Sequence, residues 1–225
     1  MKVYFGICGT AFRKDDAKRC SKPIFDAMYI VADSLVKQCE ESNYKIDTLI
    51  SGGAAGADFV AVKLFLDKKV PRLKLFIPCR WNDGTFESKQ EKDPGSTLNY
   101  YHKKFQLATR INSLSQMQIA KGEGAEFISV KQGFFARNYL IAKYSDFLLA
   151  MTFGKGSVVK SGGSSHTVKC YLDRVKKEGF FDKSFHYDLN KGEIYPGCIV
   201  SKEDANKQAV KKIFKNLSFP LPTNP

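Results

Sequence analysis

The sequence contains few of the features that place a chain in a membrane or build a structural metal site. No stretch approaches the roughly 20 apolar residues that a transmembrane helix needs. The N-terminal MKVYFGICGT has no long apolar core and no small-residue cleavage site. The six cysteines include no CxxC pair, and the three histidines (His102, His166 and His186) do not stand at zinc-ligand spacing from them. We therefore expect a cytoplasmic protein with reduced thiols, no membrane partner, no metal and no cofactor.

Acidic residues are scarce relative to basic ones. The 225 residues include 36 Lys and Arg against 23 Asp and Glu, which gives a formal net charge of +13. Such an excess attracts anions such as nucleotides or nucleic acid, although solvated basic faces would give the same balance. The hydrophobic fraction of 43% and the charged fraction of 26% are ordinary for a folded domain. The length suits one core, so we predict a single domain over residues 1–219 and a loose tail over 220–225.

Internal repeats and low-complexity tracts are also absent, and short apolar runs alternate with longer amphipathic stretches. We predict strands at 2–8, 47–51, 73–77, 147–152 and 184–189, and helices at 23–41, 58–69, 136–144, 165–178 and 203–216. Strands alternating with helices favour an α/β fold of Rossmann type, in which a parallel sheet carries helices on both faces. Ligands bind such sheets at the carboxyl ends of the strands.

Residues 80–132 interrupt this alternation. The segment contains the turn-forming strings NDGT and DPGST and the aromatic and basic stretch NYYHKKF. We interpret it as an insertion over the ligand-binding edge of the sheet, partly helical around residues 103–121. It is either a functional lid or a surface excursion with no role in the site.

Two glycine-rich segments follow predicted strands in the first quarter of the chain, GICGTAFR and SGGAAGAD. Turns of this kind expose backbone N–H groups that can cradle phosphate oxygens, although glycine at a strand end is also common for purely geometric reasons. Arg13 could add a bidentate contact to phosphate, and Asp58 could orient a ribose hydroxyl or simply stabilise a helix N-terminus. The ligand-binding candidates here are Gly9, Thr10, Arg13, Ser51, Gly52, Gly53, Gly56 and Asp58.

Two further segments open predicted helices in the second half of the chain. The string GGSSHT follows the strand FLLAMT and a basic loop, so free N–H groups, hydroxyls and a positive helix end would meet there. The string GFFARN places two polar residues at the start of an apolar helix, where they face either the cleft or solvent. The ligand-binding candidates here are Arg137, Asn138, Gly162, Gly163, Ser164, Ser165, His166 and Thr167.

The order of these motifs resembles the SLOG superfamily, which groups DprA/Smf proteins with the lonely-guy (LOG) phosphoribohydrolases. The strings SGGAAGAD and ARNYLIAKYSD carry the resemblance, which covers most of the chain outside the insertion and is closest to the YspA/YpsA-related branch. The resemblance implies a Rossmann-like fold that binds a nucleotide-like small molecule, such as a nucleoside phosphate or an ADP-ribose derivative. Family members commonly dimerise, so it also implies a homodimer.

Members similar to LOG cleave the N-glycosidic bond of nucleoside 5′-monophosphates, using an Arg-Lys pair and a GGxGTxxE loop. Arg137 matches the arginine, but Asn138 replaces the lysine, and Lys169 or Cys170 falls at the glutamate position. Neither residue can replace a carboxylate that stabilises an oxocarbenium-like centre. The catalytic candidates are therefore Arg137, Asp58 and Asp146, with Glu87, Glu123 and Glu126 as further carboxylates in the insertion.

Members similar to DprA bind single-stranded DNA. The strings SGGAAGAD and FFARNYLIAKYSD of this chain resemble their SGxAxGID and FPxRNRxIAxLSD strings. The net charge of +13 is consistent with this alternative, because phosphate neutralisation dominates nucleic-acid affinity. Aromatic and basic residues at 100–105 could stack on bases. Single-stranded nucleic acid is thus the alternative partner to a small nucleotide-like ligand.

Overall fold

The computed structural model describes residues 2–130 and 132–200 of the chain. Its centre is a seven-stranded sheet in the order β6-β3-β2-β1-β7-β8-β9. The strands are β1 (Lys2–Gly9), β2 (Lys45–Ser51), β3 (Arg72–Ile77), β6 (Glu126–Ser129), β7 (Phe147–Thr152), β8 (Ser184–Asp188) and β9 (Glu193–Pro196). All neighbours pair in parallel except β8 and β9. A separate hairpin joins β4 (Trp81–Asn82) to β5 (Thr85–Phe86).

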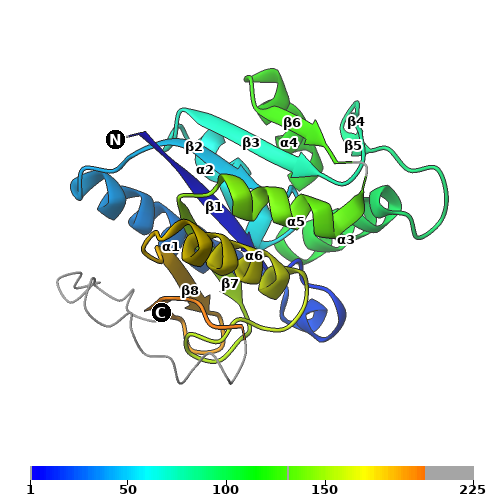
Figure 1. Cartoon of the computed structure of the whole chain (residues 1–225). Helices are drawn as coiled ribbons and strands as arrows, with labels where there is room; N and C mark the ends of the chain where they lie inside the picture. The colour runs from blue at the N-terminus through cyan, green and yellow to red at the C-terminus, as the bar shows by residue number, and fades with distance from the viewer. Residues whose placement is uncertain (1, 131, 201–225) are drawn as a thin grey trace.

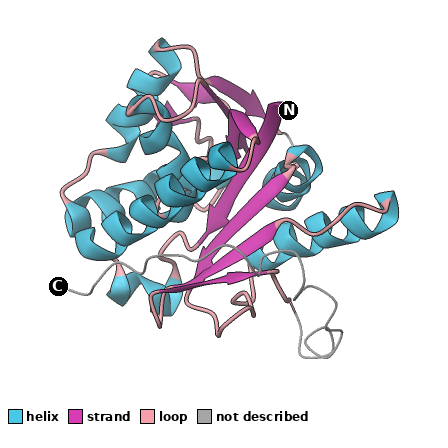
Figure 2. Ribbon diagram, turned by 90° about the vertical axis from the view of Figure 1, so that its left-hand side faces the viewer, coloured by secondary structure: helices cyan, strands magenta, loops and turns pink. Residues whose placement is uncertain are grey.

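Helices cover both faces of the sheet, as Figure 2 shows. They are α1 (Lys22–Glu41), α2 (Ala57–Leu66), α3 (Pro94–Thr109), α4 (Ser113–Gly122), α5 (Gly133–Tyr144) and α6 (Gly163–Glu178), with a short 3₁₀ helix, η1 (Lys14–Arg19). The first four α-helices pack on one face, whereas α5 and α6 pack together on the other (Figure 1). This arrangement confirms the predicted Rossmann-like α/β fold.

The central strand β7 shows why this sequence forms a doubly covered sheet. All six of its residues are buried. Phe147, Leu149 and Met151 join the core under α1 and α2, while Leu148 and Ala150 join the core under α6. Alternate side chains of a strand point to opposite faces, so an unbroken apolar run fits a strand that is covered on both sides.

The predicted strands and the first four predicted helices are present with small shifts of their ends. The predicted helix at 203–216 and the tail at 220–225 lie outside the described residues. Outside the segment 80–132, η1 and the antiparallel edge strand β9 were not predicted; within it, the strands β4, β5 and β6 were not predicted either. Among the described residues, no helix combines the length and the apolar character that crossing a bilayer requires.

The segment 80–132 differs from the predicted insertion. It forms a hairpin, the helices α3 and α4, and the edge strand β6, which pairs with β3 and so belongs to the main sheet. Both helices pack on the face of the sheet that α1 and α2 cover, through Phe105 and Met117. Among its described residues, none lines the cavity described below. The segment completes the sheet because β6, although short, offers its backbone to β3 at an otherwise open edge.

The strand order reverses between β1 and β7. From β1 the chain builds outward through β2, β3 and β6, and it then returns to place β7 on the other side of β1. The loops that leave these two strands therefore diverge and leave a crevice at their carboxyl ends. This is where the structure has its candidate site.

Candidate functional site

A cavity of about 480 Å³ lies at the carboxyl ends of β1 and β7. Its walls come from the loop after β1, η1, the start of α2, the loop after β7 and the first turns of α5 and α6. η1 is the dark blue turn at the lower right of Figure 1. The predicted ligand-binding residues that line the cavity are Gly9, Thr10, Arg13, Asp58, Arg137, Asn138, Gly162, Gly163, Ser164 and Thr167. Segments far apart in the sequence thus meet in one place.

Some glycines of the predicted motifs are required by packing. A Cβ on Gly9 would lie 2.1 Å from the carbonyl oxygen of Met151, so β1 and β7 could not approach each other there. A Cβ on Gly52 would lie 2.6 Å both from Cζ of Arg137 and from Oδ2 of Asp58. Gly52 therefore makes room for a buried ion pair and does not itself line the cavity.

The other residues of the SGGAAGAD loop support the cavity from beneath. The hydroxyl group of Ser51 donates to the carbonyl of Ile7 at 2.7 Å, which joins β2 to β1. Gly53 faces the core, and its carbonyl oxygen lies 3.0 Å from Nε2 of His102. Gly56 precedes α2 with a φ of +80°, a conformation that favours glycine. None of these three residues is part of the cavity wall, and the loop reaches the cavity through Ala54 and Asp58 instead.

Arg137 and Asp58 form a buried ion pair at the floor of the cavity. Nη2 of Arg137 lies 3.6 Å from Oδ2 of Asp58, and the two side chains are 11% and 4% exposed. Arg137 also donates to the carbonyl of Gly52 at 3.1 Å and to Oδ1 of Asn138.

Burial raises the pKa of Asp58, an effect that the positive charge of Arg137 opposes. Burial likewise lowers the pKa of Arg137. An arginine stays protonated in proteins, so the pair keeps a guanidinium beside the cavity.

Arg13 brings a second guanidinium to the same cavity, and this one forms no ion pair among the described residues, although the charge of Asp58 acts on it. Its Cζ lies 5.0 Å from the ring centroids of both Tyr101 and Phe134. Its Nε is buried and makes no hydrogen bond within the described part of the chain. Burial, followed by the nearby charge of Arg137, lowers the pKa of Arg13. The Phe134 ring also lies 5.4 Å from Cζ of Arg137, so it contacts both cations.

The N-terminus of α6 forms the opposite wall. Gly162 precedes the helix with a φ of +137°, and a Cβ there would meet nothing within 4 Å. The hydroxyl of Ser164 donates to the carbonyl of Gly9 at 2.7 Å, and Nδ2 of Asn138 donates to the carbonyl of Gly163 at 3.0 Å. These bonds attach the first turn of α6 to β1 and to α5. The first N–H groups of a helix lack partners within it and carry a positive partial charge, so this wall suits an anion.

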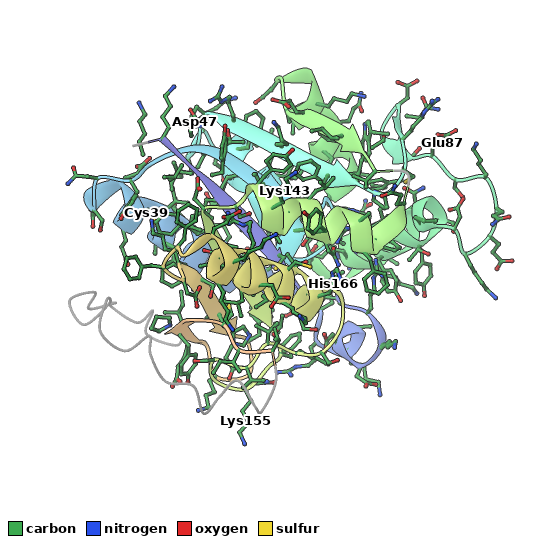
Figure 3. The ribbon with its side chains drawn as sticks, in the orientation of Figure 1. Cys39, Asp47, Glu87, Lys143, Lys155 and His166 are labelled. Atoms are coloured by element: carbon green, nitrogen blue, oxygen red, sulfur yellow. The ribbon has the colours of Figure 1, made fainter. Side chains whose placement is uncertain are left out.

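Two predicted residues of the GGSSHT string lie outside the cavity wall. Ser165 exchanges hydrogen bonds of 2.9 Å with the backbone of Gly162. His166, labelled in Figure 3, packs edge-on against Phe135 with ring centroids 4.9 Å apart. Its side chain also approaches Cys170. These contacts hold the start of α6 in place without reaching the cavity.

Asp146 lies at the other end of the sheet. It precedes β7, and its Oδ2 accepts a hydrogen bond of 2.8 Å from the backbone N–H of Tyr4 near the start of β1. Its place at the amino ends of the strands removes Asp146 from the candidate site. Glu123 and Glu126 form ion pairs with Lys68 and Lys74, and like Glu87 they are absent from the cavity wall.

Several residues of the cavity wall were not predicted. Oδ1 of Asp16 lies 2.5 Å from Nζ of Lys160, and its Oδ2 accepts a hydrogen bond of 3.0 Å from the hydroxyl of Thr10. This pair joins the loop after β1 to the loop after β7. Thr152, the last residue of β7, lines the cavity beside them. The basic loop around Lys160 was a visible signal in the sequence, whereas Asp16 stands in a polar stretch without any motif.

The described residues contain no group of His, Cys, Asp and Glu side chains arranged to hold a metal ion. The wall offers guanidinium and ammonium groups, helix N–H groups, hydroxyls and three carboxylates, of which Asp16 and Asp58 are in ion pairs. It can bind an anion and hydrogen-bond to the polar groups attached to that anion.

No protein-family model matches the chain. Among solved structures, it is similar to the X-ray structure of DNA processing protein A (DprA) from Streptococcus pneumoniae, with 14% sequence identity and a TM-score of 0.40. That match covers 91% of this chain, which spans 60% of the length of the DprA chain. Among curated proteins, the "Uncharacterized protein R261" of Acanthamoeba polyphaga mimivirus is 39% identical over 154 residues, which cover 68% of this chain and 83% of the viral protein. At that identity and coverage, the chain belongs to the same family as this mimivirus protein.

Proposed function

We propose that the cavity binds the phosphate group of a nucleotide-derived small ligand, such as a nucleoside phosphate or an ADP-ribose derivative. One observation carries the proposal: the guanidinium of Arg13 lies at the cavity between two aromatic rings and forms no ion pair among the described residues. A charged group that is partly removed from water and unpaired in the protein favours a ligand of opposite charge. The motif resemblance to the SLOG superfamily, and to its YspA/YpsA-related branch, supports the same ligand class.

The charges around the cavity support an anion more strongly than any one residue does. The wall carries four cationic side chains and three carboxylates, which leaves one net positive charge; they are Arg13, Lys14, Arg137 and Lys160 against Asp15, Asp16 and Asp58. Asp58 pairs with Arg137 and Asp16 with Lys160, whereas Arg13 forms no ion pair among the described residues and lies in the same cavity as the N-terminus of α6. A phosphate between them would accept hydrogen bonds from a planar guanidinium and from backbone N–H groups at once. The sugar and base would then extend toward the hydroxyl and carbonyl groups of the remaining wall.

The test is a calorimetric titration of the full chain with adenosine 5′-monophosphate. Replacing Arg13 by alanine should weaken binding by about 1.5–3 kcal/mol, the scale of a hydrogen bond to a charged group. Arg13→Lys should retain part of the affinity, because it keeps the charge but loses the bidentate geometry. Arg80→Ala is the matched control, since Arg80 is exposed and is absent from the cavity wall. Equal affinities for Arg13→Ala and the unmodified chain would contradict the proposed site.

Hydrolysis of an N-glycosidic bond is the enzymatic extension of this proposal. Asp58 supports it, because it is a carboxylate of the cavity wall whose pKa is raised by burial. Chromatography of nucleoside 5′-monophosphates after incubation with the protein would detect the free base. Release of base that Asp58→Asn abolishes would assign an enzyme, whereas binding without release would assign a receptor for the ligand.

A further inference from the structure

A buried hydrogen-bonded pair lies at the cavity wall outside every sequence motif considered above. Thr152 ends β7 and lines the cavity. His186 lies on the neighbouring strand β8, is fully buried, and places Nε2 2.8 Å from Oγ1 of Thr152. The pair thus connects a histidine inside the sheet to a hydroxyl group at the ligand cavity.

The surroundings of His186 determine which way this hydrogen bond points. Nδ1 of the ring contacts the carbonyl oxygen of Gly156. A carbonyl oxygen can only accept, so Nδ1 carries the ring proton. Burial lowers the pKa of His186, which favours the neutral ring with a single N–H. Nε2 then has only a lone pair to offer, and the hydroxyl of Thr152 must donate its proton to it.

Oγ1 of Thr152 is therefore left with acceptor capacity alone. One lone pair accepts the backbone N–H of Lys160 at 3.1 Å. Within the described part of the chain, no other donor reaches this oxygen. The hydroxyl thus makes two hydrogen bonds and keeps one lone pair that a donor of a ligand in the cavity can use.

The residues next to Thr152 offer further acceptors on the same side of the cavity. Lys160 connects them, because its backbone N–H bonds to Thr152 and its ammonium group lies 2.5 Å from Oδ1 of Asp16. Each carboxylate oxygen of Asp16 has a second lone pair. The cations Arg13 and Arg137 stack on Phe134 of α5 instead. Thr152 and Asp16 thus provide two acceptors that Lys160 connects.

We propose that Thr152, with its hydroxyl oriented by His186, accepts a hydrogen bond from a hydroxyl group of the ligand. The ligand class is then a phosphorylated sugar, as opposed to a bare phosphate or a simple phosphate ester. This inference rests on the proposed phosphate site, which it extends to the neighbouring part of the ligand. Thr152 determines specificity by direct contact, and His186 is a positioning residue that acts through it.

The experiment compares two phosphate monoesters by calorimetry with the full chain. Ribose 5-phosphate carries sugar hydroxyls, whereas ethyl phosphate has the same dianionic group and no hydroxyl. The unmodified protein should bind ribose 5-phosphate about tenfold more tightly, which is the effect of one good hydrogen bond. Thr152→Val, which removes the acceptor at nearly constant volume, should bring the ratio of the two affinities close to unity, because the affinity for ribose 5-phosphate falls more than that for ethyl phosphate; Arg80→Ala, outside the cavity wall, should leave the ratio unchanged.

Two further variants separate recognition from a merely structural effect. Thr152→Ser keeps the hydroxyl and should restore the preference. His186→Asn keeps a donor toward Gly156 but removes the acceptor for Thr152, so the affinity ratio should fall toward that of Thr152→Val. Equal affinity of the unmodified protein for both esters would overturn this inference and leave the phosphate site standing. Failure to bind either ester would overturn the phosphate site, and this inference with it.

Discussion

The buried pair of Arg137 and Asp58 places a residue of the cavity wall in contacts that support the fold. Its guanidinium lies at the cavity wall, yet its hydrogen bonds go to Gly52, Asn138 and the carboxylate of Asp58. Arg13 makes no such bonds and is held by ring contacts. At the scale of single residues, Arg137 is therefore primarily a support of the site, and Arg13 is a guanidinium of the wall that forms no ion pair among the described residues.

This difference predicts that replacing Arg137 lowers the stability of the fold. Arg137→Ala should destabilise the fold by about 3–5 kcal/mol, because it leaves the buried carboxylate of Asp58 without its partner. The double variant Arg137→Ala, Asp58→Asn should recover part of that loss, since no buried charge then remains. Urea denaturation of both variants measures the effect. If Arg137→Ala alone were as stable as the unmodified chain, the pair would not be a buried ion pair of the kind described.

The elements that could be predicted from the sequence are those with strong periodic patterns. The run FLLAMT of β7 and the apolar positions of α1 were sufficient for strand and helix assignments. Three elements have too few residues for a hydrophobic period to appear, namely the edge strands β6 and β9 and the 3₁₀ helix η1. The two strands are defined by their pairing with β3 and β8. The burial patterns of β6 and β9, with no buried residue in either, illustrate the point.

The candidate site was predictable only in part for a related reason. Glycine-rich turns after strands are local features, so Gly9 and the α6 N-terminus could be recognised from the chain itself. The contact of Asp16 with Lys160 spans 144 positions and depends on β7 lying beside β1. That neighbour relation follows from the order of strands in the sheet, which no local pattern contains. The pair of Thr152 and His186 was missed because β8 had no predicted neighbour.

His102 joins three elements and should make their association sensitive to pH. It lies on α3, and its nitrogens contact Oγ of Ser113 at the start of α4 (2.8 Å) and the carbonyl of Gly53 (3.0 Å). Burial lowers its pKa from 6.5 to about 4. The unfolded chain therefore binds a proton at this residue before the folded chain does, and stability falls as the pH falls from about 6.5 toward 4.

Between about pH 7 and pH 5, the contribution of His102 to the free energy of unfolding should fall by about 2 kcal/mol. Chemical denaturation at the two pH values measures it. His186 is buried as well and contributes in the same direction, so His102→Gln is the comparison that isolates one residue. The variant should lose less stability on acidification than the unmodified chain. Parallel pH profiles would show that His102 is not held neutral in the folded state.

Two features of the whole molecule favour anions on charge grounds. One is the cavity at the strand ends, and the other is the excess of basic side chains that gives the chain a net charge of +13. Lys143 and Lys155 lie on separate parts of the described molecule in Figure 3, so basic side chains are also found away from the cavity. A spread field binds polyanions without selecting them, whereas the cavity is of a size for a small ligand.

Binding in the cavity and binding by the surface charge can be distinguished by varying the salt concentration and by the variant Arg13→Ala. If the cavity binds a small ligand, the variant should lose adenosine monophosphate binding but keep its binding of a short single-stranded oligonucleotide at low salt, measured by fluorescence anisotropy. Oligonucleotide binding through the surface charge should fall steeply between about 50 and 200 mM salt.

The DprA-like alternative makes the opposite prediction, because in that case the single strand would pass through the cavity. In that case Arg13→Ala would weaken oligonucleotide binding, and adenosine monophosphate would compete with the oligonucleotide. Arg80→Ala removes the same surface charge without touching the cavity, so it shows how much of any loss is due to net charge alone.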